Sequence, residues 1–280
     1  MILIDLSQIM MASLSIVMSK KTEPDLDFIR HLTLNSLRMY RKKYTDEYGE
    51  LVICCDGRYS WRKKYFPLYK IGRTTGRKDS PDYWTQVFEC FDTIKSELKT
   101  TFPYKYIDVK GAEADDVIGV ISRNISESEK VMIISSDHDF IQLHNNNVKQ
   151  WNPFSKKIVN TENPTQYLFE HILRGDKGDG VPNVLSADDS IVNGIRQKPI
   201  TKKYIDNFVM HNSHLNDITD EEIKNFYRNK KLIDLKETPK EIADEIWTEY
   251  IQEPKGKRED IPIFLKEKNL NFTEKTIKDF

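Results

Sequence analysis

Cysteine is scarce in this sequence, and the few cysteines present cannot form a disulfide framework. Only 3 occur among 280 residues, and two of them, Cys54 and Cys55, are adjacent in an apolar run. No Cys-x-x-Cys pair is present, so the ligand spacing of a structural zinc site is missing as well. We therefore expect a protein of a reducing compartment, with a cytoplasmic location.

Long apolar runs and a strong net charge are also missing. No segment approaches the roughly 20 apolar residues that cross a bilayer, so we expect no membrane partner. The apolar stretch 9–18 has no basic region before it, which favours a buried helix over a signal sequence. The formal net charge is −1, so bulk charge gives no evidence for nucleic acid. With 38% hydrophobic and 31% charged residues, the chain is expected to form a soluble globular protein of one large or two moderate domains.

Short apolar runs that end in aspartate are the most informative feature that the sequence does have. The runs are 2–4, 51–55 and 131–134, and the acids that follow them are Asp5, Asp56, Asp137 and Asp139. The last run is typical of a strand buried on both faces of a mostly parallel sheet. Ligands bind at the carboxyl ends of the strands in such sheets, so these four carboxylates are predicted to share one rim. Because they repel one another, we hypothesise that a divalent cation binds among them.

A helix predicted within residues 111–125 adds three more acids in its first turn. Acids there are ordinary, because they suit the positive end of the helix dipole. Glu113 and Asp115 flank the apolar stripe of this helix and are placed to reach the rim, whereas Asp116 points further from it. His138 has no second histidine or cysteine at ligand spacing, so we interpret it as a neighbour of the acids and not as a ligand.

The segment 174–184 is rich in glycine and aspartate and cannot continue a helix. It is either a plain surface loop or an extension of the metal site through Asp176 and Asp179. In the second case, Gly178 and Gly180 would let backbone N–H groups approach a phosphate closely.

The segment 57–78 combines basic and aromatic residues and contains no acid. Its cations are Arg58, Arg62, Lys63, Lys64, Lys70, Arg73, Arg77 and Lys78, and its rings are Tyr59, Trp61, Tyr65, Phe66 and Tyr69. A run of charge alone is usually a solvated surface. Rings between the cations favour a nucleic-acid partner instead, because bases can stack on rings while phosphates pair with cations.

In their order along the chain, these segments resemble the 5′-nuclease, or flap endonuclease, superfamily. The matching segments are the strand carrying Asp5, Asp56 followed by WRKKYFPLYKIGR, GAEADD, SSDHDF and GDKGDGVPNV, and they span residues 2–184. The phrases IRHLTLNS, VKQW and NKKLIDL are similar to the branch from T-even-type bacteriophages, so the likeness covers most of the chain. After VPNV, the sequence LSADDSIVNGIRQKP replaces the superfamily's compact Gly-x-Gly-x-Lys hairpin, which grips duplex backbone and holds potassium. We expect duplex binding to be retained and leave the potassium site open.

The resemblance implies an α/β fold with a mostly parallel central sheet flanked by helices. It implies a catalytic domain over 1–172, with an arch over the active site at about 57–90. A helical duplex-binding region, helix-hairpin-helix-like, would cover 173–280 and complete the metal site.

The resemblance also implies a hydrolase. It would be a structure-specific 5′ to 3′ exonuclease and flap endonuclease in phage DNA replication. Its substrates would be RNA primers in RNA–DNA hybrids and the 5′ ends of nicked or flapped duplex DNA. The chain would be a monomer in the host cytoplasm, and a single-stranded-DNA-binding protein and a sliding clamp are the implied protein partners.

Catalysis in this family implies two Mg²⁺ ions, for which Mn²⁺ can substitute, and carboxylate oxygens are suitable ligands for both. The resemblance assigns the tighter ion to Asp56, Asp115, Asp137 and Asp139, with Asp5 and Glu113 orienting ligands or waters and Asp116 as a further candidate. It assigns the looser ion to Asp176 and Asp179. Lys70 and Arg73 would contact the scissile phosphate and Tyr69 would stack on the terminal base, while the other cations of 57–78 bind nucleic acid.

Single features of the sequence also occur in two other function classes. An Asp-x-Asp at a strand end also occurs in haloacid-dehalogenase-type phosphatases, but that alternative gives no role to the basic aromatic segment. A structure-specific binding protein that has lost catalysis is the second alternative, and the acid at every matched ligand position argues against it.

Overall fold

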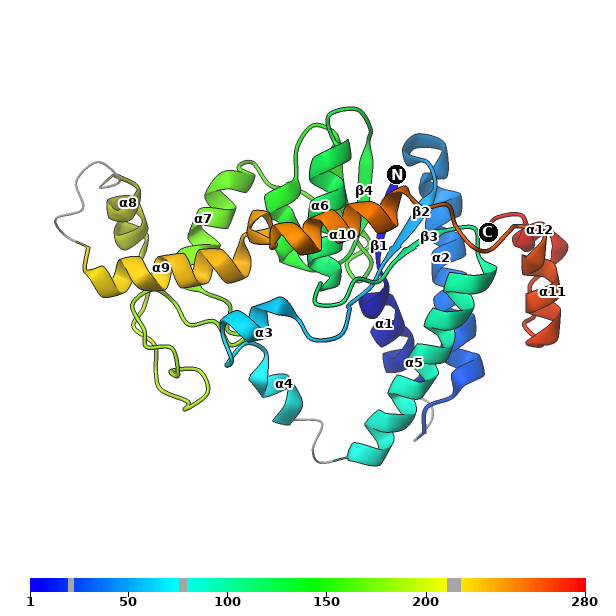
Figure 1. Ribbon diagram of the computed structural model, residues 1–280, viewed down its shortest axis with the longest axis horizontal. Coiled ribbons are helices and arrows are strands. Elements are labelled where there is room, and N and C mark those ends of the chain that lie inside the picture. Colours follow the sequence, from blue (N-terminus) through cyan, green and yellow to red (C-terminus); the bar gives the residue numbers. More distant parts are fainter. Residues whose placement is uncertain (20–22, 76–79, 211–217) are drawn as a thin grey trace.

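A central sheet of six strands forms the frame of the molecule, as seen in the computed structural model, which describes residues 1–19, 23–75, 80–210 and 218–280 (Figure 1). The strands are β1 (Ile2–Asp5), β2 (Leu51–Cys54), β3 (Lys105–Ile107), β4 (Val131–Ile134), β5 (Val148–Asn152) and β6 (Lys157–Val159). Their order is β3-β2-β1-β4-β5-β6, and every pair is parallel except β5 with β6. The expected α/β class with a mostly parallel sheet is confirmed.

Side chains alternate between the two faces of this sheet, and each face has its own core. Ile4 and Ile134 lie in a cluster with α1 (Leu6–Met18), α2 (Leu26–Tyr48) and α5 (Pro81–Thr101). Leu3 and Ile133 point to the other side, where the apolar stripe of α6 (Ala114–Ile125) covers them. Because both faces are buried, β4 is apolar along its whole length and β1 is apolar up to its last residue, Asp5, as predicted for strands of this kind.

The segment expected for the arch, about 57–90, is divided between two structures. Residues 57–75 carry two short helices, α3 (Trp61–Tyr65) and α4 (Ile71–Thr75), which lead from β2 toward the start of α5 (Figure 1). Residues 81–90 belong to α5, which buries Val87 and Phe91 in the core. We use the name arch for residues 57–75.

The C-terminal half is helical and returns to the sheet. Its elements are α7 (Pro164–Arg174), α8 (Lys202–Met210), α9 (Asp220–Ile233), η4 (Leu235–Glu237), α10 (Lys240–Ile251), α11 (Asp260–Glu267) and α12 (Glu274–Ile277). Ile246 of α10 joins the core on the α6 side, and Phe264 of α11 joins the core on the α5 side. The expected division at residue 173 stays a prediction, and the helices after it contribute to both cores. Within the described ranges, no helix is long and apolar enough to cross a membrane.

Candidate metal-binding active site

Three strand ends bring aspartates to one rim of the sheet. The strand order reverses between β1 and β4, and at such a switch point the loops at the carboxyl ends diverge and leave a crevice. Asp5 ends β1, Asp56 follows β2, and Asp137 follows β4. All three line one hollow of about 630 Å³, together with Asp115 from the first turn of α6. Three of the four acids predicted to share a rim therefore line this hollow, whereas Asp139 lines a neighbouring one.

Backbone and side-chain donors fix two of these acids. Asp5 accepts hydrogen bonds from the N–H of Gln8 (3.2 Å) and from the Ser135 hydroxyl (3.1 Å). Asp56 accepts one from the N–H of Ala114 (2.9 Å), which holds the first turn of α6 against the end of β2. These hydrogen bonds orient two of the rim carboxylates without a ligand.

Burial and close packing of the acids raise the pKa values of three of them. Burial, followed by the charges of Asp56 and Asp137, raises the pKa of Asp5 to about 7. Burial and Asp137 also raise the pKa of Asp115. For Asp139, burial and Asp137 raise the pKa to about 7. Besides burial, the pKa values are raised because neighbouring negative charges repel one another. A divalent cation bound by these carboxylate oxygens would offset that repulsion.

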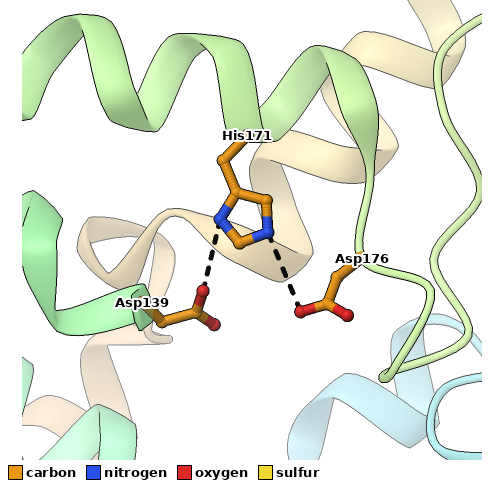
Figure 2. Close-up of side chains that lie close together, drawn as sticks. All are labelled: Asp139, His171 and Asp176. Carbon is orange, nitrogen blue, oxygen red and sulfur yellow. Dashed lines mark ion pairs between the residues drawn. The ribbon is translucent and has the colours of Figure 1, made fainter. Parts of the chain in front are cut away.

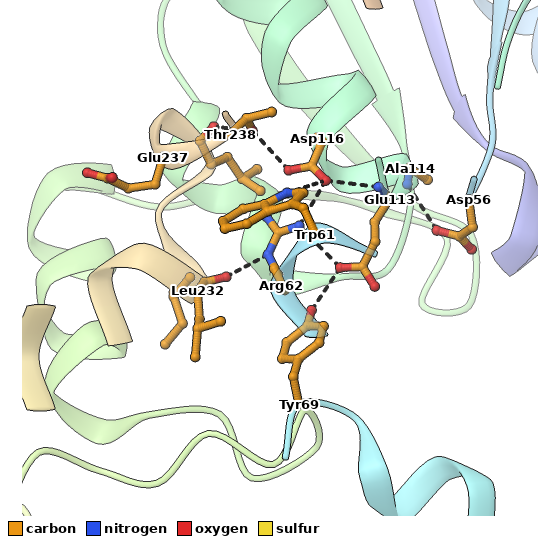
Figure 3. Close-up of polar contacts among 12 residues, drawn as sticks. Asp56, Trp61, Arg62, Tyr69, Glu113, Ala114, Asp116, Leu232, Glu237 and Thr238 are labelled. Atoms are coloured by element: carbon orange, nitrogen blue, oxygen red, sulfur yellow. Dashed lines mark hydrogen bonds and ion pairs between the residues drawn. The ribbon is translucent and has the colours of Figure 1, made fainter. Parts of the chain in front are cut away.

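Asp116 is placed apart from these acids, inside the protein (Figure 3). Its Oδ2 accepts hydrogen bonds from Arg62 (2.9 Å), Trp61 Nε1 (3.1 Å) and the Glu113 N–H (2.8 Å), and its Oδ1 accepts one from the Thr238 hydroxyl (2.9 Å). Both oxygens are occupied by protein donors, so Asp116 does not reach the rim and its expected metal role is wrong.

Arg62 is the partner of this buried acid and not a surface cation. Its side chain is 2% exposed, contacts Glu113 at 3.2 Å, and donates to the Leu232 carbonyl at 2.8 Å (Figure 3). The expected nucleic-acid contact of Arg62 is therefore wrong. The sequence shows the cation but not which buried acid it neutralises.

Three of the five rings in the arch are interior as well. Trp61, Phe66 and Tyr69 are buried, and the last two pack with residues of α7 and α9. The Tyr69 hydroxyl lies 2.9 Å from Glu113 Oε2 and 2.8 Å from Asp179 Oδ2. Because the ring is 2% exposed, a base cannot stack on it, and the role expected for Tyr69 is wrong. Tyr59 and Tyr65 are the exposed rings, at 79% and 50%.

The remaining cations of the arch are distributed along its outer side. Arg58, Lys63 and Lys64 are exposed, and Lys63 lines the hollow. Arg77 and Lys78 lie outside the described residues.

Lys70 and Arg73 connect the arch to the loop 175–184. Lys70 Nζ lies 2.7 Å from Glu113 Oε1 and 3.5 Å from Asp179 Oδ2, while Arg73 contacts Asp179 at 2.5 Å. The Lys70 N–H donates to the Asp179 carbonyl at 2.7 Å. Burial would raise the pKa of Glu113, but Lys70 and Arg62 outweigh it and lower that pKa. Lys70 and Arg73 both line the same hollow as the acids.

A glycine is needed at position 180 for a structural reason, close contact between the loop and the arch. Gly180 is buried with φ +75°, and a Cβ there would lie 2.9 Å from the Leu68 carbonyl oxygen. The missing side chain lets the loop touch the arch, and the expected phosphate contact of Gly180 stays a prediction. Gly178 is exposed.

Asp176 accepts a hydrogen bond from the Asp179 N–H at 3.1 Å and lines a second hollow, which shares Gln8 and Asp137 with the first. His171, near the end of α7, stands there between Asp139 and Asp176 (Figure 2). Its Nδ1 is 3.2 Å from Asp139 Oδ1, and its Nε2 is 3.7 Å from Asp176 Oδ2. Sequence reasoning missed His171, because nothing in the spacing of residues 139, 171 and 176 indicates that α7 brings them together.

Several buried polar residues support the site and were also missed. Gln150 on β5 donates to the carbonyl oxygens of Ser135 (2.9 Å) and Asp137 (2.6 Å), which holds the loop after β4. Asn229 on α9 donates to the Pro182 carbonyl at 2.8 Å, which holds the loop 175–184. A buried amide at an otherwise apolar position is the one sequence signal that could have indicated them.

Comparison with known proteins gives matches over the whole chain. Residues 1–170 match the family described as 5′-3′ exonuclease, N-terminal resolvase-like domain, and residues 164–280 match the family described as T4 RNase H, C terminal. Ribonuclease H of Enterobacteria phage T4 is 34% identical over 269 residues, which cover 91% of this chain and 88% of that protein. Flap endonuclease Xni of Shewanella woodyi is 31% identical over 134 residues, 45% of this chain and 50% of that protein.

Solved structures agree in fold. A bacteriophage T5 protein co-crystallised with metal ions superposes with a TM-score of 0.63 at 19% identity, covering 88% of this chain and 96% of that one. A bacteriophage T5 flap endonuclease in complex with DNA and metal ions superposes with a TM-score of 0.64, also at 19% identity, covering 90% of this chain and 99% of that one.

Proposed function

The chain belongs to the 5′-3′ exonuclease family of hydrolytic nucleases, and from that premise we propose that it is a divalent-metal-dependent, structure-specific 5′-nuclease. One observation carries the proposal: the acids at the switch point line the same hollow as three cations of the arch, Lys63, Lys70 and Arg73. Cationic side chains can neutralise the negative charge of a phosphodiester, and the carboxylates can act as ligands of the metal ions.

We assign one ion to the first hollow and one to the second. Asp56, Asp115 and Asp137 would hold the first, with Asp5 and Glu113 orienting ligands, since all five acids come from strand ends or from the start of α6 and line one space. Asp139 and Asp176 would hold the second. Mg²⁺ suits both sets of oxygens, and Mn²⁺ can replace it. Bound there, such ions supply an activated water and neutralise charge on the phosphate.

Lys70 and Arg73 would stabilise the charge that develops on the scissile phosphate. Asp179, which contacts both, keeps them aimed at the hollow, so we assign it to positioning these cations in place of the expected metal role. Arg58, Lys63 and Lys64 would bind the backbone of the nucleic acid, and the exposed ring of Tyr59 replaces Tyr69 as the stacking surface.

The relatives' names give the substrates that we propose. Relatives are called ribonuclease H and flap endonuclease, so RNA primers on DNA and flapped or nicked duplex ends are the substrates to test, in phage DNA replication. The duplex-binding role of 173–280, a monomeric state, and binding to a single-stranded-DNA-binding protein and a sliding clamp remain proposals from the resemblance.

A 5′-labelled RNA primer on a DNA template, incubated with Mg²⁺ or with EDTA, tests the proposal. Release of short 5′ products only in Mg²⁺ is expected. Retention of the intact primer in a complex, without cleavage in Mg²⁺ or Mn²⁺, would instead identify a binding protein that has lost catalysis.

A further inference from the structure

His171 occupies a position between two acids that the proposed catalytic scheme does not use. It extends from α7, while Asp139 comes from η1 (His138–Leu143) after β4 and Asp176 from the loop after α7 (Figure 2). One donor atom from each of the three residues lies within 4.8 Å of the others. Three donors from three separate segments therefore meet at the second hollow.

The two ring nitrogens of His171 have different surroundings. Nε2 faces the Asp176 carboxylate at 3.7 Å, and His171 helps to lower the pKa of Asp176 against the effect of burial. Nδ1 is buried and makes no hydrogen bond within the part of the chain that the structure describes, although Asp139 Oδ1 is only 3.2 Å away. A buried ring nitrogen without a hydrogen bond, beside a carboxylate oxygen, is an arrangement that a cation satisfies.

The distance between these atoms fits a shared ion. Metal bonds of about 2.1 Å place neighbouring ligands about 3.0 to 3.4 Å apart in octahedral or tetrahedral geometry. A ligating histidine also usually donates its other ring N–H to a carboxylate, which fixes the tautomer and the orientation of the ring. Asp176, which faces Nε2, occupies the position of that carboxylate.

We infer that His171 Nδ1 is a ligand of the second ion, beside Asp139, and that Asp176, proposed above as a ligand, instead orients the ring by facing its Nε2. This inference rests on the proposed function, because Asp139 must face an ion there. An imidazole nitrogen makes the site mixed in donor type. Mixed nitrogen and oxygen sites favour first-row transition ions such as Mn²⁺, Fe²⁺ or Zn²⁺ over Mg²⁺. The second site therefore discriminates between metals, whereas the first, lined by carboxylates, does not.

Pulsed electron paramagnetic resonance of Mn²⁺ bound to the full chain, without nucleic acid, tests the inference. The wild type should show coupling of Mn²⁺ to a directly bound nitrogen, and incorporation of ¹⁵N-histidine should change that coupling. His171→Gln should abolish it and weaken Mn²⁺ binding at one site by about 10-fold or more, the scale of losing one element of a metal site. The ratio of Mn²⁺ to Mg²⁺ affinity should fall in the same variant.

His138→Gln is the matched control, because His138 is exposed and lines the same hollow. Its nitrogen coupling should equal that of the wild type, and His171→Asn repeats the test if the glutamine variant does not fold. Bound Mn²⁺ without nitrogen coupling, or coupling that is lost only in His138→Gln, would overturn the inference and leave the proposed function intact. A wild type that binds no Mn²⁺ would overturn both.

Discussion

At the scale of residues, the structure separates the cations that hold the fold together from those that are free to meet a substrate. Arg62 neutralises Glu113 and Asp116 inside the protein, whereas Lys64, two positions along the same helix, is exposed. The sequence WRKK does not show which of its three cations is buried and which are exposed, since all three look alike in a basic run. The strand-end acids could be predicted because each directly follows a recognisable buried strand.

Arg62→Ala should destabilise the protein by about 3 to 5 kcal/mol, since removing one partner leaves buried carboxylates without their counter-charge. Lys64→Ala should change stability by less than about 0.5 kcal/mol. Urea unfolding of the two variants is the measurement. Equal stability of both, with weaker DNA binding in Arg62→Ala, would contradict the buried role.

Lys70→Ala should lower the single-turnover cleavage rate by about 10² or more, because a preorganised charge is removed from the hollow. Affinity for a forked duplex should fall only modestly. Lys63→Ala is the control: it lines the hollow but is exposed, so it should weaken binding and reduce its salt dependence. A Lys70→Ala variant that changed affinity alone would remove this lysine from the chemistry.

Asp139→Asn should stabilise the metal-free protein at neutral pH, by about 1 kcal/mol. Burial and the charge of Asp137 raise the folded-state pKa of Asp139 to about 7, while an unfolded aspartate titrates near about 3.9. The folded wild type thus holds a proton that the unfolded chain releases, so this group's contribution to stability is complete below about pH 4 and is lost as the pH rises to about 7. In the variant this decrease in stability is absent, because an asparagine side chain does not ionise.

Thermal melts in EDTA between pH 4 and pH 8 test this. The variant should melt about 2 to 4 °C higher than the wild type at pH 8 and the difference should shrink toward pH 4. Mg²⁺ should raise the wild-type melting temperature beyond the effect of matched ionic strength. A variant less stable than the wild type at every pH would indicate an ordinary surface acid.

At the scale of elements, the arch and the loop 175–184 form one unit. Backbone contact at Gly180 and the pairs of Asp179 with Lys70 and Arg73 join segments that are more than a hundred residues apart. Apolar periodicity predicted the helices and strands themselves. It could not predict the inward turn of Tyr69 and Phe66, because the partners that bury them come from α7 and α9.

Gly180→Ala should lower both stability and cleavage. Its φ of +75° costs an L-residue about 1 to 2 kcal/mol, and the new Cβ would press on the Leu68 carbonyl oxygen and displace Asp179 from Lys70. Gly72→Ala, in helix α4 with open space around it, should be neutral or slightly stabilising. Melting temperatures and cleavage rates of the two variants decide the matter, and an unimpaired Gly180→Ala would show that loop and arch are independent.

At the scale of the whole molecule, the order of the strands creates the site. Asp5 and Asp137 become neighbours because β1 and β4 pair, although residues 6–130 lie between these two strands in the chain. The sequence predicted that strand ends share a rim, since parallel strands must. It did not predict the strand order, nor that α10 and α11 close the two cores from the far end of the chain.

The central claim is that the rim of acids is a catalytic metal site facing a nucleic-acid surface. Asp137→Asn tests it most directly, because Asp137 is exposed to both hollows and removing its charge leaves the arch untouched. Asp244→Asn, an exposed acid on α10, is the matched control. Binding to a forked duplex and single-turnover cleavage in Mg²⁺ are measured on both variants.

The account predicts that Asp137→Asn binds the fork as the wild type does and does not cleave it, while Asp244→Asn does both. Near-normal cleavage by Asp137→Asn in Mg²⁺ would contradict the account.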